Sequence, residues 1–193
     1  MAGKPAYDES AVLTQAVKVF WTHGYAGTAI SDLVDATGLS RSSLYQRFVD
    51  KDGLFLEALA VYHERVIARM KAVAEKNPSS SIEAILRDFA PSSAGPARPS
   101  GCFVARSCVE SPSLPDALKK AALKCLKEQH AVFVEQLERG IKHKEVKAGT
   151  DTEDVGWYYL GVFHAVLNFS LLVAKRKSID GLIDTALLAT KQR

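Results

Sequence analysis

The sequence predicts an all-α protein with an N-terminal three-helix domain that contains a helix-turn-helix and a larger C-terminal helical domain. Three observations lead to this prediction. Apolar residues recur at helical spacing along the whole chain. No stretch alternates apolar and polar residues for long enough to form a sheet. With 193 residues, 47% of them hydrophobic, the chain can bury a core in one small and one larger domain.

Three short helices are expected before residue 51. Each follows a residue that favours a helix N-cap, and the first two end at a glycine that can adopt the left-handed conformation. The caps are Asp8 or Ser10, Thr28 and Ser40, and the glycines are Gly24 and Gly38. Leu39 fills the angle before the third helix, whose Leu44 and Phe48 point back to the core. This pattern of helix, tight turn and helix predicts a helix-turn-helix in a domain of residues 1–51.

A long fourth helix over residues 51–76, capped by Asp50, is expected to connect this domain to a second one of residues 77–193. Residues 78–81 are predicted as a linker, and a brief helix is expected over about 82–89. Residues 91–101, rich in Ser, Ala, Gly and Pro, are predicted to be mobile. Further helices are expected over about 102–110, 116–144, 152–175 and 178–190.

The net charge of +3 does not by itself indicate a nucleic-acid partner. Residues 1–76 contain nine Lys and Arg against nine Asp and Glu, so the excess lies in the C-terminal part. DNA binding would therefore depend on where individual charged side chains lie on one face.

The third helix has such a face. Once Leu44 and Phe48 are buried, every outward side chain carries a group that can form hydrogen bonds, and none is acidic. These side chains are Arg41, Ser42, Ser43, Tyr45, Gln46 and Arg47. A solvated helix usually mixes charges of both signs, whereas a helix in the major groove needs donors for phosphates and base edges. A purely structural helical hairpin is the alternative.

From about residue 8 to residue 59 the chain resembles the TetR family of repressors. Spacing and residue type agree over about fifty positions. The matching residues are Phe20, Gly24, Tyr25, Thr28, Ile30, Asp32, Leu33, Thr37, Gly38, Leu39, Ser40, Ser43, Leu44, Tyr45, Phe48, Lys51, Leu54 and Phe55.

The resemblance implies a regulator that binds double-stranded DNA, most simply a homodimeric repressor on a palindromic operator that a small molecule releases. It assigns base contacts to Arg41, Ser42 and Gln46. It assigns phosphate contacts to Thr28, Ser43, Tyr45 and Lys51, and Arg47 on the same face is grouped with them. The alternative is a helical protein that senses a small molecule or a thiol reagent and acts through protein partners.

Two apolar stripes near the C-terminus predict the dimer interface, because two helices from each subunit can form a four-helix bundle. The first is Tyr159, Val162, Phe163, Val166, Phe169 and Val173; the second is Ile179, Leu182, Ile183, Ala186 and Leu187. The alternative is that both stripes belong to the core of one chain. The uncharged run 157–174 superficially resembles a membrane span, but a helix buried at a subunit interface explains it better.

A ligand pocket is predicted among the fourth to eighth helices. Its candidates are chosen by residue type: Tyr62, Phe89, Phe103, Arg106, Phe133, Gln136, Tyr158 and His164. Each of them could instead be core or surface.

The three cysteines contain no CxxC pair, and the histidines lack the spacing of metal ligands, so no disulfide framework, metal site, cofactor or enzyme is predicted. Cys102 opens a helix one turn before Arg106, an arrangement that favours a thiolate and allows a redox or electrophile sensor. The alternative is a small apolar residue packed at the start of a helix. Without an apolar leader at the N-terminus, a cytoplasmic location is expected.

Overall fold

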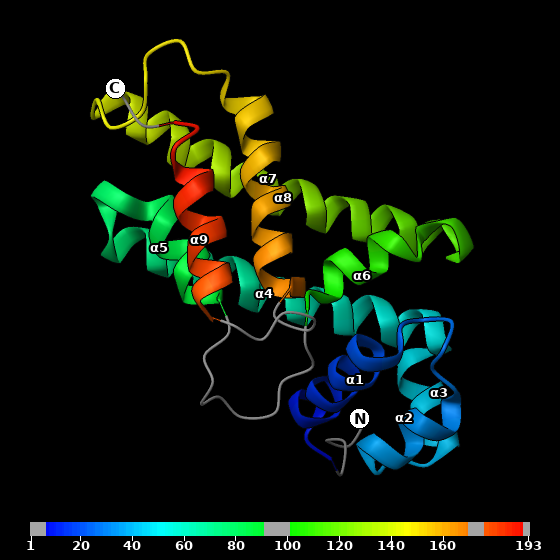
Figure 1. The fold of residues 1–193 in the computed structure, drawn as a ribbon. Coiled ribbons are helices and arrows are strands. Elements are labelled where there is room, and N and C mark those ends of the chain that lie inside the picture. Colours follow the sequence, from blue (N-terminus) through cyan, green and yellow to red (C-terminus); the bar gives the residue numbers. More distant parts are fainter. Residues whose placement is uncertain (1–6, 91–100, 170–175, 191–193) are drawn as a thin grey trace, which may run out of the picture. The chain divides into compact units, whose positions relative to one another are not determined.

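The computed structural model describes residues 7–90, 101–169 and 176–190, and every regular element in these ranges is helical, which confirms the predicted fold class (Figure 1). The helices are α1 (Glu9–His23), α2 (Ile30–Thr37), α3 (Arg41–Phe48), α4 (Lys51–Lys76), α5 (Ser81–Phe89), α6 (Phe103–Val109), α7 (Asp116–Lys142), α8 (Thr152–Phe169) and α9 (Arg176–Leu187). Two short 3-10 turns, η1 (Pro78–Ser80) and η2 (Ser111–Ser113), precede α5 and α7.

The chain folds into two compact units that interleave along the sequence. The first unit contains Met1–Glu64 and Phe103–Leu123, and the second contains Arg65–Cys102 and Lys124–Arg193. Helices α4 and α7 therefore contribute to both units. The units do not coincide with the sequential division at residues 51 and 77, because α6 and the start of α7 fold with the N-terminal helices.

The first unit begins with α1, whose start is fixed by Asp8. The Asp8 carboxylate accepts hydrogen bonds from the backbone N–H groups of Ser10 at 2.9 Å and Ala11 at 3.3 Å, so Asp8 rather than Ser10 is the cap. The helix ends at Gly24, whose φ of 75° favours glycine. The buried side of α1 carries Val12, Leu13, Ala16, Val17 and Phe20.

Helix α2 begins one residue later than predicted. Its N-cap is Ala29, and the Asp32 carboxylate accepts a hydrogen bond from the Ala29 N–H at 2.8 Å. The prediction that Thr28 caps this helix is wrong, because the Thr28 hydroxyl donates instead to the Gly24 carbonyl. Gly38, with φ 71° and ψ 5°, ends α2 as predicted.

Aromatic rings form the centre of the first unit. Phe55 of α4 contacts Phe20, Tyr25 and Phe103 edge to face, with ring centroids 5.1 to 5.4 Å apart. Such contacts add to the free energy of apolar burial. Helices α1, α4 and α6 are joined by this cluster.

The second unit packs α5, α8 and α9 together, and α8 and α9 run side by side (Figure 1). Arg87 of α5 reaches α9, where it pairs with Asp180 at 3.4 Å and Asp184 at 2.5 Å. Residues predicted as a linker, 78–81, instead form η1 and the first residue of α5. The 3-10 turn follows from Pro78, which has a φ suited to a first helical position.

The remaining helices follow the predicted order with shifted ends. Helix α7 stops at Lys142, and α9 runs over Arg176–Leu187 rather than 178–190. The predicted mobile segment 91–101 lies outside the described residues except for Gly101, and so do the last residues of the helix expected to reach 175. Within the described ranges, no helix combines the length and apolar character needed to cross a membrane.

Candidate nucleic-acid interface

A tight turn joins α2 to α3 and orients the third helix. Gly38 donates its N–H to the Val34 carbonyl at 2.9 Å, and the buried Leu39 anchors the turn. The Ser40 hydroxyl then accepts a hydrogen bond from the Ser43 N–H at 3.1 Å, which starts α3 as the sequence predicts.

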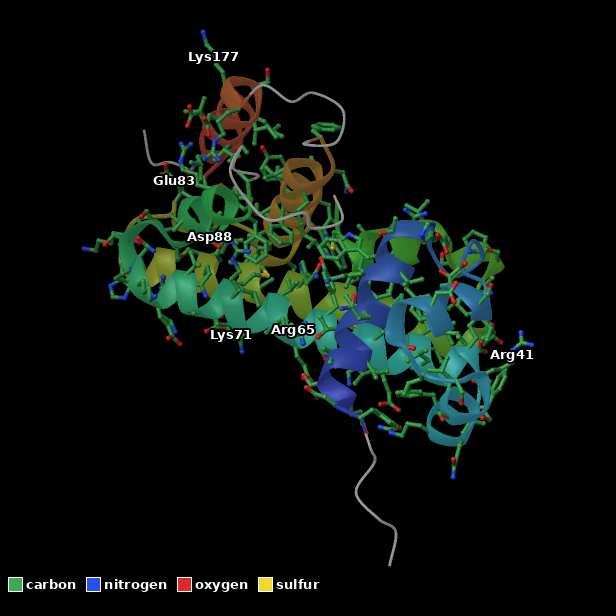
Figure 2. All side chains as sticks on the ribbon, turned by 90° about the horizontal axis from the view of Figure 1, so that it is seen from below. Arg41, Arg65, Lys71, Glu83, Asp88 and Lys177 are labelled. Atoms are coloured by element: carbon green, nitrogen blue, oxygen red, sulfur yellow. The ribbon has the colours of Figure 1, made fainter. Side chains whose placement is uncertain are left out.

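Helix α3 buries one side and exposes the other. Leu44 and Phe48 are 4% and 3% exposed and lie in the core. The exposed side carries Arg41, Ser42, Tyr45 and Gln46, with Ser43 half-buried beside them. Figure 2 shows the Arg41 side chain projecting away from the ribbon. The three residues predicted to contact bases therefore share one solvent-facing surface.

Arg47 differs from this group. Its guanidinium forms ion pairs with Glu9 of α1 and with Glu57 of α4, the latter at 2.9 Å, and lies over the Phe48 ring. The hydrogen bonds that it donates to Glu9 and then to Glu57 raise the pKa of the guanidinium further above its ordinary value. The sequence predicted an outward side chain on an acid-free face, but acids from two other helices neutralise it. Their positions are set by packing, which the local sequence of α3 does not contain.

Thr28 does not present its side chain to solvent. The residue is 2% exposed, and its hydroxyl donates to the Gly24 carbonyl at 2.5 Å. The expected phosphate contact by this side chain is therefore corrected, because burial leaves its hydroxyl inside the turn between α1 and α2.

Lys51, the first residue of α4, lies against Tyr25. Its Nζ is 4.3 Å from the centre of the Tyr25 ring, within the range of a cation–π interaction. Burial lowers the pKa of Lys51, and the opposing charges of Asp52, Glu110 and Asp32 limit the shift. The Tyr25 ring thus gives the Lys51 side chain a defined position at the start of α4.

Tyr25 is itself held at both ends. Its hydroxyl donates to the Asp52 carboxylate, and its backbone N–H donates to Glu110 Oε2 at 2.8 Å. Burial, followed by the bond to Asp52, raises the pKa of Tyr25 to about 12. Glu110 also pairs with Arg106, at 3.2 Å from Nε to Oε1. The contact between Glu110 and Tyr25 could not be predicted from the sequence, because 85 residues separate them.

The predicted pocket residues fall in two groups. In the first unit, Tyr62 and Phe103 are buried with their rings 5.6 Å apart, whereas Arg106 is exposed and pairs with Glu110. Arg106 is therefore a surface ion-pair partner and not part of an enclosed pocket wall.

In the second unit, Phe89 and Phe133 both contact the Phe163 ring, with centroids 4.9 and 5.9 Å away. His164 forms a hydrogen bond between its Nε2 and Gln129 Oε1 at 2.9 Å, and burial lowers the pKa of His164 to about 4. Gln136 is 5% exposed. Tyr158 is 43% exposed on α8, and its hydroxyl donates to the Ala186 carbonyl of α9 at 3.5 Å.

The apolar stripes predicted as a dimer interface belong mainly to the core of one chain. The buried members, each at most 9% exposed, are Tyr159, Val162, Phe163, Val166, Ile179, Ile183, Ala186 and Leu187. Helices α5, α8 and α9 pack together in this unit, which favours the alternative that both stripes belong to the core of one chain. Leu182 is half-buried, Phe169 is 48% exposed, and Val173 lies outside the described residues.

Another face of α8 and α9 is open instead. It carries three exposed apolar residues of α8, Trp157, Tyr158 and Phe169, and the exposed glycines Gly161 and Gly181; the Trp157 ring also stacks on His130 of α7, with centroids 4.1 Å apart. A Cβ added at either glycine would meet nothing within 4 Å. Leu188, directly after α9, is 68% exposed.

Cys102 is 2% exposed and precedes α6. The Arg106 side chain that was expected to favour its thiolate is paired with Glu110. Both observations favour the alternative of a packed residue over a reactive thiol.

Comparisons with known proteins agree with this architecture. ComR of Escherichia coli, a helix-turn-helix transcriptional repressor, is 32% identical over 150 residues, which cover 75% of this chain and 69% of ComR. The structure of a CifR cysteine mutant bound to 26-bp operator DNA is 28% identical, covers 97% of this chain and all of CifR, and has a TM-score of 0.85. A TetR-family regulator from Cytophaga hutchinsonii shares the fold, with a TM-score of 0.84 at 19% identity over 95% of this chain and 94% of its own.

Two family models match as well. Residues 12–58 match the bacterial regulatory proteins of the tetR family, and residues 78–186 match the tetracyclin repressor-like C-terminal domain. The members of this family are transcriptional regulators and not enzymes. Together with the helix-turn-helix and the exposed face of α3, these matches show that the chain belongs to the TetR family of bacterial regulatory proteins.

Proposed function

We propose that this protein is a homodimeric transcriptional repressor that binds a palindromic operator through α3 and leaves it when a small molecule binds the second unit. The observation that carries the proposal is the exposed side of α3, where Arg41, Ser42 and Gln46 lie beside one another. ComR is a repressor, and CifR was captured on operator DNA. Such a regulator would act in the cytoplasm.

The side chains on this surface divide by what they can contact. Arg41 and Gln46 read bases, because guanidinium and amide groups pair bidentately with guanine and adenine. Ser42, at the start of the helix, contacts base edges beside them. Ser43, Tyr45 and Lys51 hold phosphates, which positions the helix without reading sequence. Thr28 and Arg47 support the domain from within, because one is buried and the other is paired with Glu9 and Glu57.

Two copies of the chain are needed to read a palindrome. Dimerisation through the open face of α8 and α9 would place two α3 helices in successive major grooves, about 34 to 36 Å apart. A ligand that prefers the conformer unable to span both half-sites would release the operator, with ordinary coupling of about 1 to 3 kcal/mol.

The proposal is tested with operator DNA obtained by selection from a random-sequence pool, followed by titrations at several salt concentrations. Arg41→Ala and Gln46→Ala should each weaken binding to the selected site by about 1 to 3 kcal/mol and leave non-specific binding unchanged. Lys51→Ala should weaken binding to every sequence and reduce the salt slope by about 0.9.

Lys71→Ala is the matched control for Lys51→Ala. Lys71 is exposed and lies 20 residues further along α4, about 30 Å away. This variant should bind the operator like the unmodified protein. A pool that yields no enriched palindrome at low salt would refute the proposal and support a protein that acts through other proteins.

A further inference from the structure

The turn after α1 is bound by a carboxylate from a distant part of the chain. Glu110, directly after α6, accepts a hydrogen bond at Oε2 from the Tyr25 N–H at 2.8 Å. Its other oxygen, Oε1, lies 3.2 Å from Arg106 Nε. Each carboxylate oxygen thus has its own donor, and the bond to Tyr25 is charge-assisted, which makes it about twice as strong as a neutral one.

The backbone at Gly24 leaves room for this carboxylate because glycine has no Cβ. Gly24 has φ 75° and ψ 178°, a conformation that side chains rarely adopt. A Cβ at Gly24 would lie 1.7 Å from Glu110 Oε1, so the carboxylate occupies the position that any other side chain would take. The Glu110 side chain is 20% exposed, which limits competition from water for the bond.

Tyr25 extends from this point to the start of α4. Its hydroxyl donates to Asp52, and its ring faces Lys51 Nζ at 4.3 Å. A lysine on a free surface has about 2 kcal/mol of rotamer entropy, part of which is lost when it binds a phosphate. A ring that already holds the ammonium group reduces this loss.

We infer that Glu110 is a positioning residue for DNA binding, which fixes Tyr25 so that its ring holds Lys51 in place for a phosphate. This inference depends on the proposed function, in which Lys51 contacts the operator. Glu110 itself contacts no DNA in this scheme. It acts through the hydrogen bond that it accepts from the Tyr25 N–H and not through electrostatic repulsion of phosphates.

A purely electrostatic role predicts the opposite effect. Glu110 carries a negative charge near the surface that meets phosphates, so its removal would reduce repulsion and tighten DNA binding. The positioning role predicts weaker binding after the same substitution. Whether DNA affinity rises or falls when Glu110 is replaced therefore distinguishes the electrostatic role from the positioning role.

The experiment measures operator affinity and salt slope by fluorescence anisotropy for Glu110→Ala, Glu110→Asp and Glu110→Gln, each with and without Lys51→Ala. Aspartate keeps the charge but is one methylene too short to reach Tyr25, whereas glutamine keeps an acceptor oxygen and removes the charge. We expect Ala and Asp to weaken binding at least about fivefold, the low end of ordinary coupling between sites, and to reduce the salt slope by up to about 0.9. Glutamine should stay within about twofold of the unmodified protein.

The double variants show whether Glu110 affects DNA binding through Lys51. In the Lys51→Ala background, Glu110→Ala and Glu110→Asp should have almost no further effect, because interacting residues are not additive. Glu135→Ala, on an exposed position of α7, is the control for loss of one negative charge. Urea unfolding checks that each variant is folded, and the charge-preserving Asp variant gives the answer if the Ala variant does not fold.

The outcomes separate this inference from the proposed function. If Lys51→Ala leaves operator affinity unchanged, the proposed phosphate contact fails. If Lys51→Ala weakens binding but the Glu110 substitutions add to it independently, tighten it, or act equally for Asp and Gln, then the positioning role is wrong and the proposed function stands.

Discussion

Val49 adopts φ 68° and ψ −54° at the end of α3. The Asp50 N–H donates to the Phe48 carbonyl at 2.8 Å, which makes Val49 the centre of a γ-turn. A positive φ is unfavourable for a β-branched residue. The chain accepts it here because Phe48 and Leu54, six residues apart on either side of the turn, are both buried. Nothing in the local sequence predicted this conformation.

We expect Val49→Gly to raise the free energy of unfolding by about 1 kcal/mol. Strain of this kind costs about 1 to 3 kcal/mol, the entropy of glycine offsets part of the gain, and little burial is lost because Val49 is 77% exposed. Urea unfolding measures the change. Val109→Gly, at an 81% exposed position at the end of α6, should not stabilise the protein, and stabilisation by both variants would contradict the argument.

His164 predicts a pH dependence of stability. Burial lowers its pKa in the folded protein to about 4, below the usual 6.5 of an unfolded chain. Below pH 6.5 the unfolded chain therefore binds the proton more readily, and stability falls as the pH decreases from about 6.5 to about 4, by up to about 3 kcal/mol. His164→Gln should flatten the curve of unfolding free energy in this window. An unchanged slope would show that another group is responsible.

At the level of helices, ion pairs connect α3 to α1 and α4. Arg47 joins α3 to α1 through Glu9 and to α4 through Glu57. Its side chain is 34% exposed, and pairs of this exposure contribute at most about 1 kcal/mol. Because they tie α3 to two other helices, we expect them to act mainly on the orientation of α3.

Arg47→Met tests this anchoring role. Methionine keeps an apolar stem over Phe48 and removes both ion pairs. We expect the free energy of unfolding to fall by up to about 1 kcal/mol and the salt slope of DNA binding to stay the same. A slope reduced by about 0.9, as expected for Lys51→Ala, would instead identify Arg47 as a phosphate contact.

At the scale of the whole molecule, the open face of α8 and α9 is the surface on which we expect a second copy. Gly161 lies on this face, and a side chain there meets nothing within 4 Å of its Cβ, so the chain itself tolerates substitution. We expect Gly161→Arg to give a monomer by size-exclusion chromatography with light scattering. Operator binding should then fall to the non-specific level, about a thousandfold weaker or more.

Ala72→Arg is the control for added bulk and charge, because Ala72 is exposed on α4. This variant should stay dimeric. A dimeric Gly161→Arg protein that binds its operator normally would show that the copies meet elsewhere.

The helices, the helix-turn-helix and the side chains on the exposed face of α3 could all be predicted from the amino-acid sequence. These features depend on local information: apolar spacing, the cap Ser40 and the left-handed Gly38. The partners of Arg47 and Glu110 became known only from the folded structure, since they lie up to 85 residues away in the sequence. Contacts between distant parts of the chain also explain why the apolar stripe of α8 that contains Tyr159, predicted as a dimer interface, is buried within one chain. Periodicity shows which side of a helix is apolar, but whether that side faces its own chain or a partner depends on how the helices pack.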